Sequence, residues 1–162
     1  MLAPVEFDRS ACSVAGALAV VGEKWSLLVI REAFLGVRRF ADFHRMLGAP
    51  RAVLTERLAT LVDQGILRRV PYQEEGERQR HEYRLTEKGL DLYPALVALM
   101  QWGDRYVGEP GAVPLELQHR ECGSPVHVGL ECEAGHHIAG ARDVRPVPQT
   151  HQARHAQEAA RI

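Results

Sequence analysis

Four helical repeats of apolar residues follow one another in the first part of the chain, and a glycine follows each. The first is apolar almost all round, so we expect it to be buried, either in the core or in a subunit interface. The third and fourth confine their apolar side chains to one face, as surface helices do. The predicted helices are residues 13–21, 24–35, 39–47 and 51–64.

The period of the pattern then changes. Residues 66–72 and 81–86 are typical of strands, and the polar segment between them contains Gly76, which predicts a β-hairpin with an exposed tip. Thr86 is a good N-cap for a long helical segment that continues to about residue 107. Because Pro94 lies inside this segment, the helix is either kinked there or begins close to it.

The composition shifts near residues 108–111, where glycine and proline cluster, and we place a domain boundary there. The residues beyond it contain only short apolar groups, and the polar, alanine-rich end is expected to be a frayed helix or a flexible tail. The predicted organisation is a lead-in (1–10), a main domain (11–108), a small Cys/His-containing appendage (109–149) and a tail (150–162).

The order of elements in the main domain is that of a winged helix-turn-helix. The expected fold is therefore mainly α with a small β-hairpin wing, plus a short C-terminal β-hairpin-like appendage. In such a unit, helix 51–64 enters the DNA major groove by its N-terminal end. Four residues there are expected to face bases: Arg51, Ala52, Thr55 and Glu56. Those expected at phosphates or in the minor groove are Arg38, Arg39, Arg57, Arg78, Gln79 and Arg80.

Charge supports this interpretation only locally. The whole chain has 20 Lys and Arg against 21 Asp and Glu, a net charge of -1. Residues 38–84 carry ten Arg and seven acidic residues, a local excess of three positive charges. These arginines could instead form an ordinary solvated surface. Three acidic residues lie beside the wing arginines and would repel DNA: Glu74, Glu75 and Glu77. They favour an alternative function, a protein-interaction module built on a degenerate winged helix and the C-terminal hairpin.

Four short motifs in order make the likeness more specific. They are G-x-K-W at Gly22 to Trp25, R-R-F at Arg38 to Phe40, L-x-x-R-L at Leu54 to Leu58, and Y-x-L-T-x-K-G at Tyr83 to Gly89. Over roughly residues 12–106, the chain resembles the HxlR family, a bacterial branch of winged-helix transcription regulators similar to the MarR group. The resemblance implies a homodimer, held by the N-terminal and the long C-terminal helix, that binds a palindromic operator, most simply as a repressor.

Cys12 lies just before the first predicted helix, where members of this family often carry a cysteine that senses oxidants or electrophiles. A helix N-terminus favours a thiolate and so raises its reactivity. The alternative is a small side chain that packs at the dimer seam. A small-molecule signal held between the long helix and the winged domain is a further alternative, although no residue pattern identifies the molecule.

The appendage contains two close Cys/His pairs that could supply four tetrahedral zinc ligands: His119, Cys122, Cys132 and His136. Two C-x-x-C pairs, the usual zinc-ribbon pattern, are not present. A redox pair of Cys122 with Cys132, or cysteines that only pack in a plain hairpin, are the alternatives. The main domain itself requires no cofactor.

Other classes of function find little support. Apolar residues make up 46% and charged residues 25%, which excludes wholesale disorder. No apolar run approaches the roughly 20 residues that cross a bilayer, and no signal peptide is recognisable. Nucleophile-elbow, phosphate-loop and dinucleotide motifs are missing, so we expect no enzyme. With three cysteines and no secretory context, the cytoplasm is the expected compartment.

Overall fold

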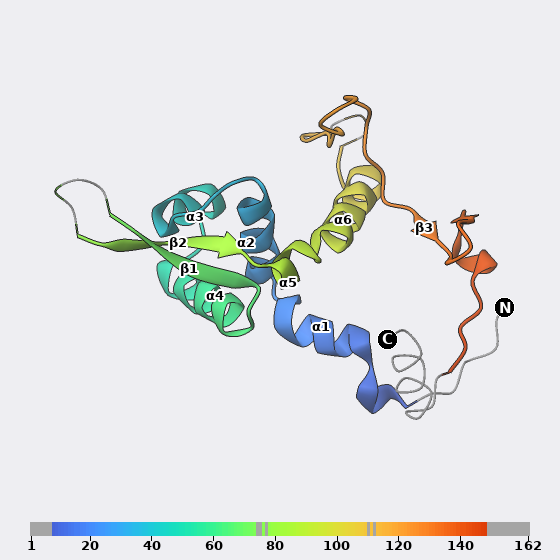
Figure 1. Cartoon of the computed structure of the whole chain (residues 1–162), viewed down its shortest axis with the longest axis horizontal. Coiled ribbons are helices and arrows are strands. Elements are labelled where there is room, and N and C mark those ends of the chain that lie inside the picture. The colour runs from blue at the N-terminus through green and yellow to red at the C-terminus, as the bar shows by residue number, and fades with distance from the viewer. Residues whose placement is uncertain (1–7, 74–75, 77, 110, 112, 149–162) are drawn as a thin grey trace. The chain divides into compact units, whose positions relative to one another are not determined.

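The computed structural model describes residues 8–73, 76, 78–109, 111 and 113–148 (Figure 1). Short 3-10 turns cover Arg9–Ala11 and Ala141–Asp143. The helices are α1 (Ser13–Val21), α2 (Lys24–Phe34), α3 (Phe40–Leu47), α4 (Arg51–Asp63), α5 (Glu87–Leu90) and α6 (Tyr93–Tyr106). The strands are β1 (Leu67–Tyr72), β2 (Arg80–Leu85), β3 (Leu130–Glu131) and β4 (His137–Ile138). The predicted winged helix-turn-helix, with its four leading helices and β-hairpin, is confirmed.

By its contacts the chain divides into two compact units: Val14–Val128, and Met1–Ser13 together with Gly129–Ile162. The first contains α1 to α6 and both strands of the wing, and it continues about 20 residues beyond the predicted boundary near residue 108. The second contains the short antiparallel pair β3–β4. The predicted appendage of residues 109–149 is therefore shared between the two units.

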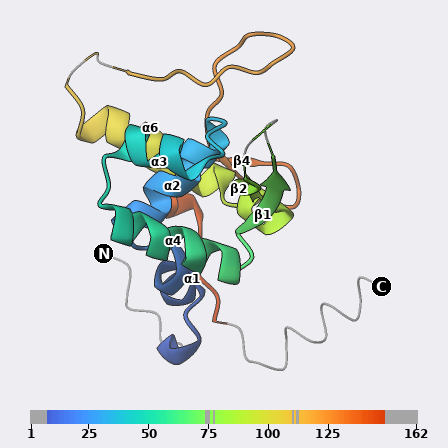
Figure 2. The same ribbon diagram turned by 90° about the vertical axis from the view of Figure 1, so that its left-hand side faces the viewer.

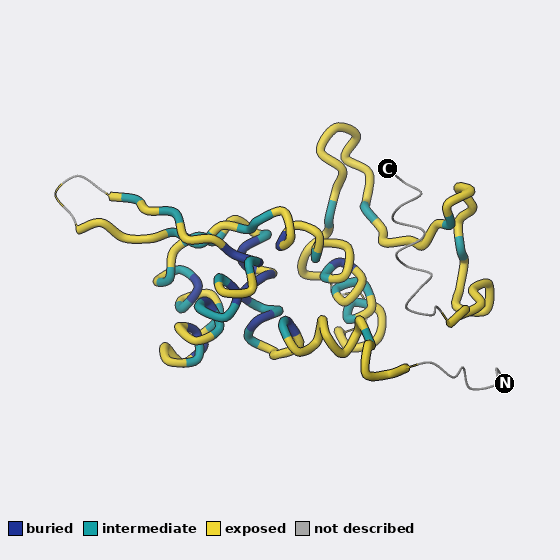
Figure 3. The backbone as a smooth tube through the Cα atoms, turned by 60° about the horizontal axis from the view of Figure 1, so that its bottom comes forward, coloured by how far each residue is buried: buried dark blue, intermediate teal, exposed yellow. Residues whose placement is uncertain are grey.

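The core of the Val14–Val128 unit is formed by α2, α3 and α4. Side chains of these helices that are completely or almost completely inaccessible include Ile30, Phe43, Leu54, Leu58 and Leu61. Along α4 they recur every three or four residues, as the sequence pattern predicts, and Figure 3 shows the buried positions on several neighbouring segments of the backbone. Gly48, at φ +62°, ends α3 in the left-handed conformation, and α4 starts three residues later.

The wing is an antiparallel hairpin that is anchored to the start of α3. Its register runs from Leu67 opposite Leu85 to Tyr72 opposite Arg80. The backbone N–H of Tyr83 donates to the carbonyl of Arg38 at 2.8 Å, and Arg39 forms an antiparallel bridge with Glu82. The loop before α3 thus adds a short third strand to the hairpin, which holds the wing beside the helix-turn-helix.

Thr86 and Gly89 connect the wing to the C-terminal helices. The Thr86 hydroxyl accepts from the N–H of Gly89 at 3.2 Å and donates to the carbonyl of Gly65 at 2.6 Å. A Cβ at Gly89 would lie 2.3 Å from the carbonyl oxygen of Ile66, so no larger residue fits without displacement. The helical segment is interrupted after α5, and α6 then begins with Pro94 in its first turn, which confirms the second of the two expectations for Pro94.

The first helix is not buried in the core of one chain, which was one of the two places expected for it, and its burial in a subunit interface stays a prediction. In α1 only Val21 is buried, while Val14 and Leu18 are 67% and 58% exposed. No described helix alone is long and apolar enough to span a membrane; α1 and α2 together reach that length and composition, but they are bent by 78° against each other.

Candidate nucleic-acid interface

The outer face of α4 carries the residues predicted to contact bases. Its inner face is buried through Leu54, Leu58 and Leu61, which leaves the opposite face to solvent. The exposed positions in the first turns are Arg51, Ala52, Thr55 and Glu56. The Thr55 hydroxyl donates to the carbonyl of Arg51 at 2.8 Å. All four predicted residues therefore lie on the accessible face that a base contact requires, and the contacts themselves stay predictions.

A cleft of about 670 Å³ lies between the start of α3, the start of α4 and the wing. Figure 2 views this side of the unit, with α3 and α4 in front and the hairpin beside them. Four arginines from three parts of the fold line the cleft: Arg39, Arg51, Arg69 and Arg80. The other lining residues are Phe40, Ala41, Asp42, Tyr72, His81 and Tyr83.

Aromatic rings hold three of these arginines in place. The guanidinium of Arg39 lies 4.5 Å from the ring centre of Tyr72, and that of Arg51 lies 5.1 Å from Phe40. Arg69 lies 5.8 Å from the ring of its cross-strand partner Tyr83. Stacking on a ring orients a guanidinium but leaves its N–H groups able to bind an anion.

The cleft is strongly positive. Asp42 is the single carboxylate among its lining residues, and it accepts a hydrogen bond from Arg45 at 2.8 Å. Four of the residues that line the cleft are therefore arginines, against one carboxylate. Since the cleft also lies at the N-terminal end of α3, the helix dipole adds to its attraction for anions.

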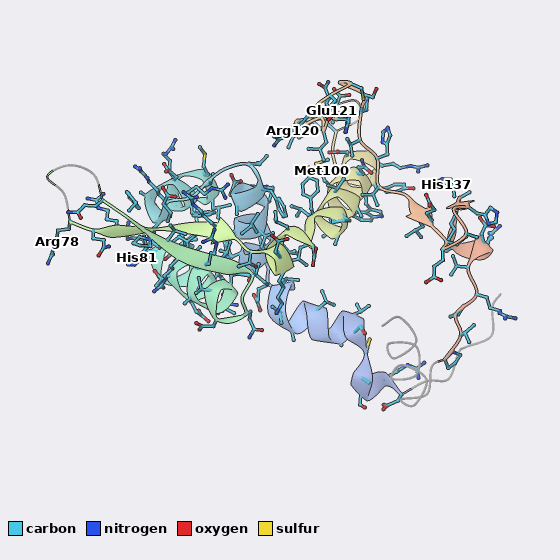
Figure 4. The ribbon with its side chains drawn as sticks, viewed as in Figure 1. Arg78, His81, Met100, Arg120, Glu121 and His137 are labelled. Carbon is cyan, nitrogen blue, oxygen red and sulfur yellow. The ribbon has the colours of Figure 1, made fainter. Side chains whose placement is uncertain are left out.

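The remaining predicted phosphate contacts lie outside this cleft. Arg38 is half-buried and donates to the carbonyl of Ala33 at 3.2 Å, and Arg57 pairs with Glu56. Arg78 and Gln79 are exposed near the wing tip, where Figure 4 labels Arg78 beyond His81. The acids that would oppose DNA there lie outside the described residues: Glu74, Glu75 and Glu77.

Sequence reasoning missed three residues of the cleft. In the sequence, Arg69 only adds to the local positive charge, and no pattern marks Tyr72 or His81 as a site residue. A signal was available, because the hairpin register pairs Arg69 with Tyr83 and brings both strands toward the start of α3. A basic residue that pairs with an aromatic residue across the two strands of a wing therefore indicates a positive cleft of this kind.

The two Cys/His pairs of the appendage are each formed, but in different units. The Cys122 sulfur lies 3.4 Å from Nδ1 of His119, and the Cys132 sulfur lies 3.5 Å from Nδ1 of His136. Hydrogen bonds from the hydroxyl and backbone of Ser124 lower the pKa of the Cys122 thiol. Cys122 is exposed, so a thiol with a lowered pKa is accessible to solvent there.

The zinc hypothesis stays a prediction. Among the described residues, no three His, Cys, Asp or Glu side chains gather as a metal site would require. Metal analysis of the purified chain before and after chelation tests the hypothesis directly. Cys12 is half-buried between a 3-10 turn and α1, and its predicted redox role also stays a prediction.

An exposed recognition helix beside a positive cleft and a hairpin wing defines the class of the protein, a winged-helix DNA-binding regulator. The HxlR-like helix-turn-helix family model matches residues 20–110, more than half of the chain. The protein therefore belongs to this family, and the resemblance noted in the sequence is confirmed.

Similar proteins are named as regulators too. An uncharacterized HTH-type transcriptional regulator of Mycobacterium tuberculosis is 51% identical over 137 residues, which cover 84% of this chain and 85% of the relative. This match is long enough that it must continue beyond residue 110. The solved transcription factor PA1607 aligns with a TM-score of 0.76 at 39% identity, covering 87% of this chain and 97% of its own. The redox regulator HypR in its oxidized form aligns at 0.55 with 30% identity, covering 60% of this chain and all of its own. Family and relatives are regulators, so the chain is not an enzyme.

Proposed function

We propose that this DNA-binding regulator is a cytoplasmic homodimeric repressor of a palindromic operator. The observation that carries the proposal is the four-arginine cleft beside the exposed N-terminal end of α4. In this arrangement α4 enters the major groove of one half-site, with Arg51 and Thr55 at base edges. The wing lies over the neighbouring backbone, with Arg78 at a phosphate or in the minor groove.

The cleft fits one phosphate group of the DNA backbone. A phosphate accepts two parallel N–H bonds from a guanidinium, and Arg39 and Arg69 are both held by aromatic rings at the edge of the cleft. A phosphate bound there fixes the depth and angle at which α4 meets the bases. The cleft therefore positions the protein, while the outer face of α4 reads the sequence.

A dimer is supported by the apolar side chains that one chain leaves in solvent. On α6, Leu99, Trp102 and Tyr106 recur at helical spacing along one face and are 54%, 58% and 61% exposed. The exposed Val14 and Leu18 of α1 add to this surface, and Figure 1 draws both helices away from the wing. Monomers seldom expose so many large apolar residues, and a two-fold dimer would cover them. It would also set two half-sites about one DNA turn apart.

Fluorescence anisotropy against DNA from upstream of the protein's own gene tests the proposal. We expect tight binding that weakens steeply with salt. Arg51→Ala is expected to cost about 1–3 kcal/mol on the specific site and to relax the preference at the bases it contacts. Arg78→Ala should weaken all sequences about equally and reduce the slope of affinity against salt by about one.

Arg120→Ala is the matched control, because Arg120 is an exposed arginine of the same unit in the segment beyond α6. Its DNA affinity and salt slope should equal those of the unchanged protein. Binding that is absent at every salt concentration, or insensitive to salt, would contradict the proposal and favour the protein-interaction alternative. A sequence-selective loss in Arg78→Ala would contradict the role given to the wing.

Thiol control is a second candidate because a structural neighbour is named as a redox regulator in its oxidized form. Cys12 directly precedes α1, whose apolar residues are exposed, so a change at this thiol would act beside the proposed dimer surface. Mild oxidation should lower the DNA affinity of the unchanged protein but not of Cys12→Ser. Equal responses of the two proteins would assign any redox effect to another cysteine.

A further inference from the structure

A second cleft of about 670 Å³ lies between α6 and residues 113–127. Its walls are mostly apolar. From α6 come Met100, Trp102 and Tyr106, and the facing segment supplies Leu115, Leu117 and Val126 among others. A volume of this size and an apolar, aromatic lining are typical of sites for small organic molecules.

The outer wall of this cleft is fixed to α6 by one side chain. The amide of Gln101 donates to the carbonyl of Val126 at 2.8 Å and accepts from the N–H of Val128 at 3.0 Å. The amide thus pairs with the segment as a neighbouring strand would. Within the segment, Gln118 and Pro125 form an antiparallel bridge, so the wall is itself a small hairpin. Figure 4 shows Met100 on α6 and, above it, the loop with Arg120 and Glu121.

The charged side chains that line the cleft differ in whether they already have an interaction partner. Glu116 accepts a hydrogen bond from Gln118 at 2.8 Å, and the guanidinium of Arg105 lies 5.1 Å from the ring centre of Tyr106. Asp104 is half-buried in the wall and has no hydrogen-bond or ion-pair partner among the residues that the structure describes. A half-buried carboxylate without a partner is an unfavourable arrangement that a bound cation would relieve.

We propose that this cleft binds a hydrophobic aromatic cation, with Asp104 as its counter-charge. The apolar body of the ligand would lie against Leu115, Leu117 and Val126, and the ring of Trp102 would attract its positive charge, since Tyr106 already lies beside Arg105. The thioether of Met100 adapts to ligands of different shape. Asp104 and Glu116 outnumber Arg105 among the charged residues of the lining, so a cation is favoured over an anion of the same size.

The occupant is a small cation rather than a second copy of the chain. Leu99 of the stripe proposed for the dimer lies outside the cleft, whereas Trp102 and Tyr106 belong both to the stripe and to the lining of the cleft. Asp104 and Gln101 also line the cleft. A partner copy that covers the stripe would offer Asp104 no counter-charge from the stripe itself. Charge complementarity thus favours a cationic ligand, since the dimer stripe itself is uncharged.

Two ions of the same shape and opposite charge test the proposal: tetraphenylphosphonium and tetraphenylborate. Binding of each to the full chain without DNA is measured by isothermal titration calorimetry, so the result does not depend on the proposed operator. We expect the cation to bind at least about tenfold more tightly than the anion. Asp104→Asn keeps the size of the side chain but removes its charge, and it should abolish this preference.

Asp63→Asn is the matched control, since Asp63 is an exposed aspartate at the end of α4, outside the cleft. It should keep the preference of the unchanged protein. Gln101→Ala should weaken the binding of the cation by releasing the wall, while circular dichroism shows the helical content retained. Equal binding of the two ions, binding of neither, or a preference that survives Asp104→Asn would overturn the proposal.

Discussion

The two sides of the Val14–Val128 unit differ in how far they bury their large apolar side chains. Around the wing and α4, large apolar side chains such as Phe43 and Leu58 are completely buried, and the surface is rich in arginine. On α1 and α6, residues of similar size such as Leu18 and Trp102 are more than half exposed. The first side buries its large apolar side chains within one chain, whereas the second leaves them exposed, which is the surface that the proposed dimer would cover.

This contrast teaches that an apolar helix need not belong to the core of its own chain. The sequence of α1 is more uniformly apolar than that of α4, yet α4 buries three leucines and α1 buries only Val21. A one-sided apolar pattern orients a helix against a core, while an all-round pattern specifies only that neighbours are needed. The neighbours can come from a second chain.

The largest expected effect is the loss of a core side chain. Phe43→Ala should lower the free energy of unfolding by about 3–5 kcal/mol, because the ring is fully buried between α2, α4 and the wing and leaves a cavity. Urea denaturation followed by circular dichroism measures it. Met46→Ala, on the exposed side of the same helix, is the control and should change stability by less than about 0.5 kcal/mol. Similar losses in both variants would contradict the contrast.

The next effect concerns the uncovered side. Leu99→Glu places a charge on the α6 stripe, so the dissociation constant of the dimer should rise at least about thirtyfold. Sedimentation velocity over a range of protein concentrations measures it. Met46→Glu introduces the same charge at an apolar position of equal exposure off the stripe, and it should leave the dimer intact. An unchanged dimer in Leu99→Glu would move the interface elsewhere.

A smaller effect is expected at the junction of the two sides. Thr86→Ala removes the N-cap of α5 and the hydrogen bonds of its hydroxyl to the carbonyls of Gly65 and Ile66. We expect a loss of about 1–2 kcal/mol in the free energy of unfolding. Thr86→Ser keeps the hydroxyl and should recover most of it. Equal losses in the two variants would assign the effect to the methyl group instead.

The smallest effect is chemical rather than structural. Since Ser124 lowers the pKa of Cys122, Ser124→Ala should raise that pKa and slow alkylation of Cys122 by iodoacetamide at neutral pH. Well above the pKa of both proteins, the two rates should converge because the thiol is then fully ionised. Mass spectrometry of each cysteine over time gives the rates. A difference that persists at high pH would indicate a change of access rather than of ionisation.

Most of the fold could be predicted because each element has its own local signal. The ends of α3, α4, β1 and β2 lie within about one residue of the predicted ones, since glycines and a change of period mark them. For α1 the sequence predicts burial in the core or in a subunit interface but cannot choose between them, because the choice depends on long-range packing that no local pattern encodes. The unit that ends at Val128 reaches past the boundary predicted near residue 108, because Gln101 joins the segment up to Val128 to α6 across more than 20 residues.

The candidate site was predicted in part. The exposed residues of α4 follow from its helical period, and Arg39 and Arg80 follow from their places next to α3 and in the wing. Arg69, Tyr72 and His81 required the hairpin register and the bridge between Arg39 and Glu82, which together bring the wing to the start of α3. The unpartnered Asp104 had no signal at all, because a carboxylate near the end of an amphipathic helix is ordinarily a solvated residue.

Gly89 constrains the direction in which α6 leaves the winged-helix core. With no Cβ, it lets α5 touch the carbonyl of Ile66, and α6 then leaves from this pivot. A helix of 14 residues is about 21 Å long, so a small tilt at its base becomes a displacement of several ångströms at its far end. In a dimer joined through α6, the tilt of this helix at its base would fix the distance between the two recognition helices. If the proposed dimer forms, one hydrogen atom in place of a methyl group at Gly89 thus helps to set the distance between the two DNA half-sites.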